Sequence, residues 1–249
     1  MSGLALWLRS FCFNVGWYAG SVVIAVVGTP ILLLPRSAVV AWARVWIAFA
    51  LWWLRVTCRL GHRLVGLENL PAGPAIIACK HQSSWETLFF TLLFDDIAIV
   101  LKRELLFIPI VGWAMARAGN IAVSRGEGAT ALRGMVRQAK ATAARGRSIV
   151  IFPEGTRVAP GDQKPYQVGV AALYRQLRLP VVPVALNSGV FWGRRKFVKR
   201  PGTITMEVLP PIAPGLGRDE FMETLRARIE PATDRLVDKA ARSGTKKEH

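Results

Sequence analysis

Residues 75–86 have the sequence AIIACKHQSSWE, which predicts a strand, a turn and a helix in direct succession. The first five residues form a short apolar run bounded by charge, as is typical of a strand buried inside a sheet. Ser83 and Ser84 are good N-cap residues, so a helix is expected to begin beside them. A buried strand that leads directly into a helix favours an α/β fold.

The same alternation continues from about residue 63 towards the C-terminus. Short apolar runs bounded by glycine, proline or charge predict five more strands, at residues 97–101, 120–124, 148–152, 181–186 and 203–209. Amphipathic periodicity predicts helices at residues 128–144, 167–178 and 218–241. We therefore expect a layered α/β sheet flanked by helices over residues 63–242, and a disordered polar tail at residues 243–249.

The first 62 residues predict a two-helix membrane anchor. Residues 11–34 contain no charged residue, and a helix of that length spans about 36 Å, enough to cross the hydrocarbon core of a bilayer. A second apolar stretch, residues 37–54, is interrupted only by Arg44. Tryptophans and arginines cluster around both stretches and no carboxylate precedes Glu68, which is typical of an interfacial anchor. A spanning pair of helices and a re-entrant pair both fit this pattern.

A cleaved signal peptide is the alternative interpretation of the first apolar stretch. That stretch is longer than the apolar region of a typical signal peptide, and a second one follows without an obvious small-residue cleavage site. An anchor is therefore the favoured interpretation.

The net charge of +17 predicts an anionic binding partner. Nucleic acid is the usual partner of so basic a chain, but many of these arginines lie beside the apolar segments. An anionic lipid surface is the simpler partner, so membrane phospholipids are expected and nucleic acid is not. Five cations within residues 194–200 fit either a lipid or carrier-protein patch or a solvated loop. Three widely spaced cysteines form neither a disulfide framework nor a zinc pattern, which favours a reducing, cytoplasm-facing domain.

His81 and Glu86 are the first candidate catalytic pair. Side chains five residues apart in a straight helix point about 140° apart, so they can meet only if His81 lies on the loop and Glu86 in the first turn. There the carboxylate would fix the imidazole tautomer and stabilise the imidazolium that forms when the other nitrogen takes a proton. Ser83 and Glu86 also fit a capping box, in which the Glu86 side chain accepts a hydrogen bond from the Ser83 amide. Both interpretations stay open from the residues alone.

Residues 152–157, with the sequence FPEGTR, are the second candidate segment. Gly155 lets the backbone turn sharply or approach a ligand closely. Arg157 offers a planar fork of donors that suits phosphate or carboxylate. The segment follows an expected strand, and ligands bind at strand ends in open α/β sheets. An ordinary surface turn with a solvated arginine is the alternative.

In this order and spacing, the two segments resemble the glycerolipid acyltransferases of the lysophosphatidic acid acyltransferase (PlsC-like) family. That family has a His-x4-Asp motif on a strand-to-helix turn and a Glu-Gly-Thr-Arg motif after a strand. The resemblance extends from about Gly66 to Ile212. It also includes Lys102-Arg103-Glu104-Leu105 with Pro109 and Gly112, residues 119–125, residues 182–185, and Lys164 with Gly169.

Three departures from the family pattern stand out. Glu86 replaces the usual aspartate, which keeps the carboxylate but adds one methylene. Lys80 precedes the histidine where asparagine is common. Residues 121–125 keep the arginine of the second motif but lack its aromatic residue and its acid.

The resemblance implies direct acyl transfer from an acyl thioester, acyl-CoA or acyl carrier protein, to the free hydroxyl of 1-acyl-glycerol-3-phosphate (lysophosphatidic acid), which yields phosphatidic acid. His81 would deprotonate the hydroxyl and Glu86 would orient His81, with no metal and no cofactor beyond the acyl donor. The implied substrate-binding residues are Lys102, Arg125, Glu154, Gly155, Thr156, Arg157 and Lys164. The implied location is the inner (cytoplasmic) membrane, with the catalytic domain facing the cytoplasm.

Two alternatives accompany this expectation. Within the same class, the acceptor could be another lysophospholipid or a lyso-aminolipid. In a different class, the chain could be a non-catalytic basic module that binds membranes or nucleic acid. Such a module would bind nucleic acid in a salt-sensitive way and consume no thioester.

Overall fold

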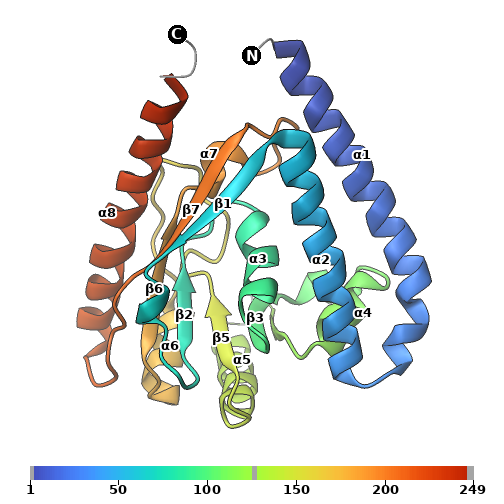
Figure 1. Ribbon diagram of the computed structural model, residues 1–249. Coiled ribbons are helices and arrows are strands. Elements are labelled where there is room, and N and C mark those ends of the chain that lie inside the picture. The colour runs from blue at the N-terminus through green and yellow to red at the C-terminus, as the bar shows by residue number, and fades with distance from the viewer. Residues whose placement is uncertain (1–2, 125–127, 246–249) are drawn as a thin grey trace.

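The computed structural model describes residues 3–124 and 128–245, with side chains through residue 242. Within these residues seven strands form one sheet in the order β1-β7-β6-β2-β5-β3-β4 (Figure 1). The strands are β1 (Leu60–Val65), β2 (Ile76–Cys79), β3 (Ile97–Lys102), β4 (Ile121–Val123), β5 (Ser148–Ile151), β6 (Val181–Leu186) and β7 (Gly202–Val208).

Helices connect and cover the strands. The α-helices are α1 (Gly3–Gly28), α2 (Arg36–Cys58), α3 (Trp85–Leu93), α4 (Val111–Arg117), α5 (Gly128–Ala143), α6 (Val168–Leu177), α7 (Ser188–Phe191) and α8 (Arg218–Thr245). Short 3-10 turns are η1 (Thr29–Leu33), η2 (Leu67–Asn69) and η3 (Arg103–Phe107). Helix α8 therefore includes the first three residues of the tail expected at 243–249, and the rest of that tail lies outside the described residues.

The central strands bring their carboxyl ends to one edge of the sheet. β2 lies between β5 and β6 and is parallel to both, and β3 is parallel to β5. β7 runs antiparallel to β6, and β1 runs parallel to β7 at the far edge. Because Ala78 pairs with Ile151, the turns that follow β2 and β5 lie side by side. The two candidate segments are thus neighbours in space.

Each face of the sheet has its own apolar core. Helices α5, α6 and α8 cover one face, where Met135, Leu173 and Leu225 are buried. Helices α2 and α3 cover the other, where Leu54 and Phe89 are buried. Figure 1 shows the sheet between α8 on the left and the α1–α2 pair on the right. Because side chains alternate along a strand, residues of β2 contribute to both cores in turn.

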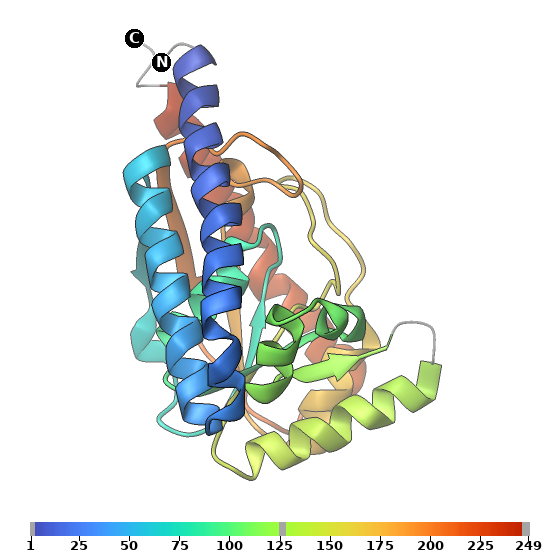
Figure 2. The ribbon, with the colours of Figure 1, turned by 90° about the vertical axis from the view of Figure 1, so that its right-hand side faces the viewer.

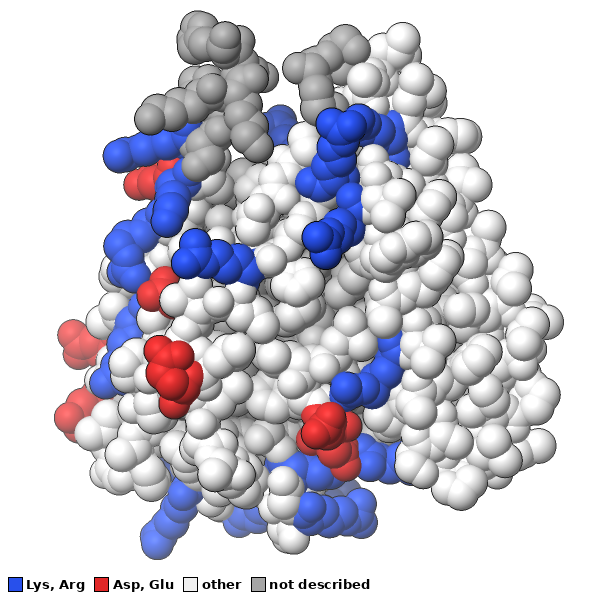
Figure 3. Space-filling model, viewed as in Figure 1, with Lys and Arg blue, Asp and Glu red and all other residues white. Residues whose placement is uncertain are grey.

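The two N-terminal helices lie side by side along one flank of the domain (Figure 2). They approach closely at Gly16, where an added Cβ would meet the indole of Trp53. By length and composition, Gly3–Leu33 and Arg36–Cys58 could each cross a membrane, and most of the first segment is not covered by protein. Figure 3 shows this flank, on the right, almost free of charged side chains. An apolar, exposed flank of this kind is consistent with membrane association.

The six strands expected from the sequence correspond to β2 to β7, with ends that agree within one residue. The sequence did not predict β1, and the expected domain boundary at residue 62 falls inside it. The physical reason is its composition. Leu60–Val65 has the sequence LGHRLV and lies at the sheet edge, where only Leu60 is buried, so no apolar run marks it.

Candidate active site

His81 lies on the turn between β2 and α3, and Glu86 lies in the first turn of α3. The Nδ1 atom of His81 is 2.9 Å from Oε1 of Glu86. The Glu86 side chain is fully buried, whereas that of His81 is 13% exposed. The ring of His81 stacks on Phe152 with centroids 3.9 Å apart. Among the described residues, none forms a hydrogen bond with Nε2, so this nitrogen is available to a substrate.

Glu86 also accepts hydrogen bonds from the backbone of the same turn. Its Oε1 atom accepts from the amides of Gln82 and Ser83, each at 2.7 Å. The Ser83 contact is one half of the predicted capping box. The Ser83 hydroxyl, however, accepts from the amide of Trp85 at 2.8 Å, so the reciprocal half differs from the usual pattern. One carboxylate therefore both caps the turn and holds His81.

The charge state of Glu86 follows from these contacts. Burial by itself would raise the pKa of Glu86, but the hydrogen bond and positive charge of His81, with the Ser83 amide, outweigh burial and lower the pKa. The carboxylate is therefore ionised at neutral pH and can only accept. Nδ1 of His81 must then carry the proton, which leaves the lone pair on Nε2. This tautomer is the one that a general base requires.

Ser188 is a site residue that the sequence did not predict. It begins α7, directly after β6, and its hydroxyl donates to Oε2 of Glu86 at 2.8 Å. The next amide, that of Gly189, donates to Oε1 of Gln82 at 3.0 Å. Both contacts fix the histidine turn to α7. The available signal was a polar residue just past the expected strand at 181–186, on the sheet edge that bears His81.

The FPEGTR segment forms a tight turn beside His81. The amide of Gly155 donates to the carbonyl of Phe152 at 2.9 Å, and Gly155 has a φ of 63°, a conformation that favours glycine. The amide of Val158 donates to the carbonyl of His81 at 2.7 Å. This last bond joins the arginine turn to the histidine turn.

Arg157 is half-buried, and none of the described residues forms a hydrogen bond or an ion pair with its guanidinium. Burial lowers the pKa of Arg157, the charges of Arg194 and Arg195 lower it further, and the charge of Glu86 opposes them. The guanidinium therefore lies within the electrostatic field of the His81–Glu86 pair. A partly desolvated arginine without a protein partner is suited to an anionic ligand.

The other predicted binding residues are less closely grouped. Lys102 ends β3 and is exposed, Thr156 is partly exposed on the turn, and Lys164 is exposed on the following loop. No contact in the described part of the chain joins Lys102 or Lys164 to His81. Arg125 lies outside the described residues.

Glu154 points into the protein. Its side chain is fully buried, and its Oε1 atom is 3.1 Å from Nζ of Lys80, a distance that makes an ion pair without hydrogen-bond geometry. Burial raises the pKa of Glu154 to about 7, Lys80 opposes this shift, and the charge of Glu230 adds to it. Glu154 is thus placed to support the turn from beneath.

Replacing Glu154 with glutamine is expected to change stability in a pH-dependent way. A carboxyl pKa raised in the folded state means that the parent loses stability as pH rises from about 4.5 to about 7. Glutamine does not titrate, so Glu154→Gln should match the parent near pH 4.5 and exceed it by up to about 3 kcal/mol at pH 8. Thermal unfolding followed by circular dichroism from pH 4.5 to 8 measures this difference. A difference that stays constant with pH would contradict the prediction.

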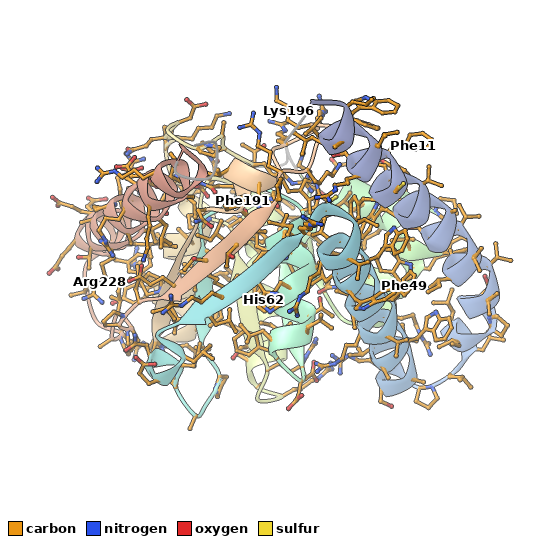
Figure 4. The ribbon with its side chains drawn as sticks, turned by 45° about the horizontal axis from the view of Figure 1, so that its top comes forward. Phe11, Phe49, His62, Phe191, Lys196 and Arg228 are labelled. Atoms are coloured by element: carbon orange, nitrogen blue, oxygen red, sulfur yellow. The ribbon has the colours of Figure 1, made fainter. Side chains whose placement is uncertain are left out.

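The basic loop around residues 194–200 contains one cation with a structural role. Lys199 is buried, and its Nζ donates to Oδ1 of Asn14 at 3.0 Å while it lies over the rings of Phe13 and Trp192. The loop is thereby tied to α1, and Figure 4 shows Lys196 beside the start of that helix. Arg194, Arg195, Lys196 and Arg200 are exposed. Among the described residues no group of three His, Cys, Asp or Glu side chains could hold a metal ion.

Together the fold and the site define an α/β protein with a His–Glu pair at the end of a central strand, set beside a turn suited to an anion. The chain belongs to the Acyltransferase family, whose model matches residues 62–187.

Curated relatives carry a more specific name. The chain is 40% identical over 165 residues to the 1-acyl-sn-glycerol-3-phosphate acyltransferase of Pseudomonas aeruginosa, over 66% of this chain and 64% of the relative. It is 32% identical over 143 residues to the human 1-acyl-sn-glycerol-3-phosphate acyltransferase beta, over 57% of this chain and 51% of the relative. The chain thus spans about half to two-thirds of the length of these relatives.

A solved structure has the same fold. The 1-acyl-sn-glycerophosphate acyltransferase PlsC from Thermotoga maritima matches with a TM-score of 0.68 at 20% identity. The match covers 94% of this chain and 96% of that one, so the shared fold extends well beyond residues 62–187.

Proposed function

We propose that this protein transfers an acyl group from an acyl thioester to the free hydroxyl of 1-acyl-glycerol-3-phosphate and so forms phosphatidic acid. One observation carries the proposal: the His81–Glu86 pair at 2.9 Å, with Nε2 available, lies beside the guanidinium of Arg157, which has no hydrogen-bond or ion-pair partner within the described part of the chain. The names of the curated relatives support the choice of acceptor.

The proposed reaction proceeds by direct transfer. Glu86 holds the Nδ1–H of His81, and Nε2 takes the proton of the acceptor hydroxyl as that oxygen attacks the thioester carbonyl. The tetrahedral intermediate expels the thiolate, which takes the proton back from the imidazolium. Glu86 stabilises the imidazolium by its charge while it exists. No covalent acyl-enzyme is needed, because the acceptor itself is the nucleophile.

Arg157 is proposed to bind the phosphate of the acceptor. Its planar fork can form two charge-assisted hydrogen bonds, and partial burial strengthens them relative to those of a solvated side chain. Lys102, Thr156 and Lys164 are proposed to add donors along the same edge of the sheet, while Glu154 and Gly155 shape the turn. Arg125, outside the described residues, is proposed as a further donor.

The membrane flank is proposed to place this site at a bilayer. A lysophospholipid partitions into the membrane, and the exposed apolar helices α1 and α2 would hold the domain there. We propose the inner membrane, with the catalytic domain in the cytoplasm. The arginine-rich, carboxylate-free segment 1–67 and three free thiols support this orientation.

The acyl donor is proposed to be acyl-CoA or acyl carrier protein. Both are anionic. The exposed Arg194 and Arg195 lie close enough to Arg157 to lower its pKa, and the exposed Lys196 follows them in the chain. A basic surface would speed the encounter with either donor.

The deciding experiment assays the purified protein in detergent micelles or vesicles. Thioester consumption and phosphatidic acid are measured with both donors against a panel of lysophosphatidic acid, other lysophospholipids and a lyso-aminolipid. Phosphatidic acid as the main product supports the proposal. A preference for another acceptor would make that acceptor the substrate in place of lysophosphatidic acid. No thioester consumption, with salt-sensitive binding to nucleic acid, would instead support a binding module.

Replacing Arg157 with lysine should raise the KM for lysophosphatidic acid by about tenfold to a hundredfold, because a point charge replaces a bidentate fork. Initial rates over a range of acceptor concentrations measure the effect. Arg175→Lys makes the same change on the exposed face of α6 and serves as the control. An unchanged KM would show that Arg157 does not bind the phosphate.

A further inference from the structure

Lys80 is a buried cation placed back to back with His81. Along β2, Ile77 and Cys79 face the core under α2 and α3, and Ile76 and Ala78 face the core under α8. Continuing this alternation, His81 faces α3, whereas Lys80 points towards α8. The Lys80 side chain is only 1% exposed. A buried cation of this kind needs compensating charge.

Two carboxylates supply that charge. Nζ of Lys80 is 2.7 Å from Oε2 of Glu230 and 3.1 Å from Oε1 of Glu154. Glu154 belongs to the arginine turn, and Glu230 belongs to α8. All three residues are buried. Lys80 therefore joins the strand end that bears His81, the turn that leads to Arg157, and the C-terminal helix.

The same helix also holds the far end of the loop that begins at the arginine turn. The Tyr166 hydroxyl donates to Oε1 of Glu230 at 2.7 Å. One turn earlier in α8, Arg226 lies over the Tyr166 ring and donates to the carbonyl of Lys164 at 2.9 Å. The loop from Phe152 to Gln167 contains no helix or strand, so these contacts, together with the bond from the Val158 amide to the His81 carbonyl, help to hold its position.

We propose that Glu230 is a positioning residue for acyl transfer. Through Lys80 it fixes the strand end that carries His81, and through Tyr166 it fixes the loop that carries Arg157. The proposal rests on the proposed acyltransferase function. It places a contribution to the site in α8, beyond residues 62–187 that match the family model. It also gives a role to Lys80, which stands where the resembling family commonly has asparagine.

The charges in this cluster allow a test by substitution. Glu230→Gln leaves Lys80 paired with Glu154, so the buried cation still has one carboxylate and the fold should persist. What it loses is the charged anchor in α8 for both Lys80 and Tyr166. Glu223→Gln makes the same chemical change on the exposed face of α8 and is the matched control.

In Glu230→Gln, and not in the control, two measurements on the full-length protein are expected to change, while a third, the KM for the acyl donor, is expected to stay the same. The kcat for acyl transfer falls by about tenfold to a hundredfold, because small displacements of a catalytic group have effects of this size. The KM for the acyl donor stays within about twofold, since the substitution removes positioning and no donor contact. Hydrogen exchange of the amides in residues 156–166 becomes faster.

The pH dependence of stability provides a further readout of this buried cluster. Glu154 is faced by Lys80, Glu230 and Tyr166, and Cys79 also senses its charge. The charge of Glu230 raises the pKa of Glu154, so its removal lowers that pKa. The loss of stability that accompanies ionisation of Glu154 should therefore end at lower pH, and be smaller, in Glu230→Gln than in the parent. The same pH dependence of thermal unfolding in both proteins would contradict the coupling of Glu230 to Glu154.

Combining two substitutions tests the part that Lys80 plays. In the parent, Glu154→Gln is expected to stabilise the protein at pH 8. In the Glu230→Gln background the same change strands Lys80 without a carboxylate, so the midpoint of thermal unfolding should fall instead. A Glu154→Gln effect of the same sign in both backgrounds would contradict coupling through Lys80.

Tyr166→Phe keeps the proposal testable if Glu230→Gln fails to fold. It removes one hydrogen bond and no charge, so a smaller loss of kcat is expected, again with faster exchange in residues 156–166. Wild-type kcat in folded Tyr166→Phe and Glu230→Gln, from a parent that transfers acyl groups, would refute the positioning role. A parent without transferase activity would refute the proposed function instead, while the exchange data would still report on the loop.

Discussion

Alanine at position 81 is expected to lower kcat/KM for acyl transfer by about 10²- to 10⁴-fold, the usual contribution of a general base. Without the imidazole, none of the described residues offers a base at the place where Nε2 would take the proton of the acceptor hydroxyl. An alcohol that keeps its proton is a weak nucleophile, so thioester consumption should fall in parallel with phosphatidic acid formation. Both are measured in the assay described above.

The fold should survive the loss of the His81 side chain. Glu86 would keep the amides of Gln82 and Ser83 and the hydroxyl of Ser188 as donors, so no buried carboxylate is stranded. Circular dichroism and the midpoint of thermal unfolding verify this point.

The control is His62→Ala. His62 lies on the edge strand β1 (Figure 4). Its ring packs near Trp85 and Phe89. The same substitution there removes a packed ring without touching the site. Full activity in His81→Ala would refute the proposed mechanism, as would an equal loss in both variants.

The sequence predicted most of the sheet because its central strands are buried on both faces. Runs such as Val181–Leu186 then have no polar residues to obscure the pattern. Strand β1 escaped because an edge strand tolerates glycine, histidine and arginine. The helices that cover the sheet were predictable where one face alone is apolar, as in α5.

In the site, the contacts between residues close in sequence were predictable, and the contacts between distant residues were not. The His81–Glu86 contact was predictable because both residues lie on one strand-to-helix turn, five positions apart. The contact of Ser188 with Glu86 joins residues 102 positions apart, and that of Lys80 with Glu230 joins residues 150 positions apart. Only the packing of α7 and α8 against the ends of the strands brings those partners together. A short sequence motif does not predict which distant elements pack against it.

The two departures at Lys80 and Glu86 acquire a common explanation from the structure. The longer side chain of Glu86 reaches His81 with one oxygen and Ser188 with the other. The Nζ atom of Lys80 donates a hydrogen bond to Oε2 of Glu230 on α8. Each residue thus connects the histidine turn to an element beyond it, α7 in one case and α8 in the other. The turn is held from both sides of the sheet.

Replacing Glu86 with glutamine separates the two uses of this carboxylate. The amide oxygen of glutamine can still accept from Gln82, Ser83 and Nδ1 of His81, and its NH2 group can donate to the Ser188 hydroxyl. The turn should therefore keep its geometry and the protein its thermal stability. A neutral amide cannot balance the imidazolium that forms during the reaction, so kcat should fall by about 10²- to 10⁴-fold.

Glu86→Asp is the graded companion to this test. It keeps the charge but is one methylene shorter, so it cannot hold His81 and Ser188 at their present distances together, and partial activity is expected. Comparing kcat and the midpoint of thermal unfolding across the parent, Glu86→Gln and Glu86→Asp separates the effect of the negative charge from the effect of side-chain length. Wild-type kcat in Glu86→Gln would mean that the carboxylate only caps α3, because capping survives the change and charge does not. A low kcat with an unchanged midpoint would identify Glu86 as the acid that supports His81.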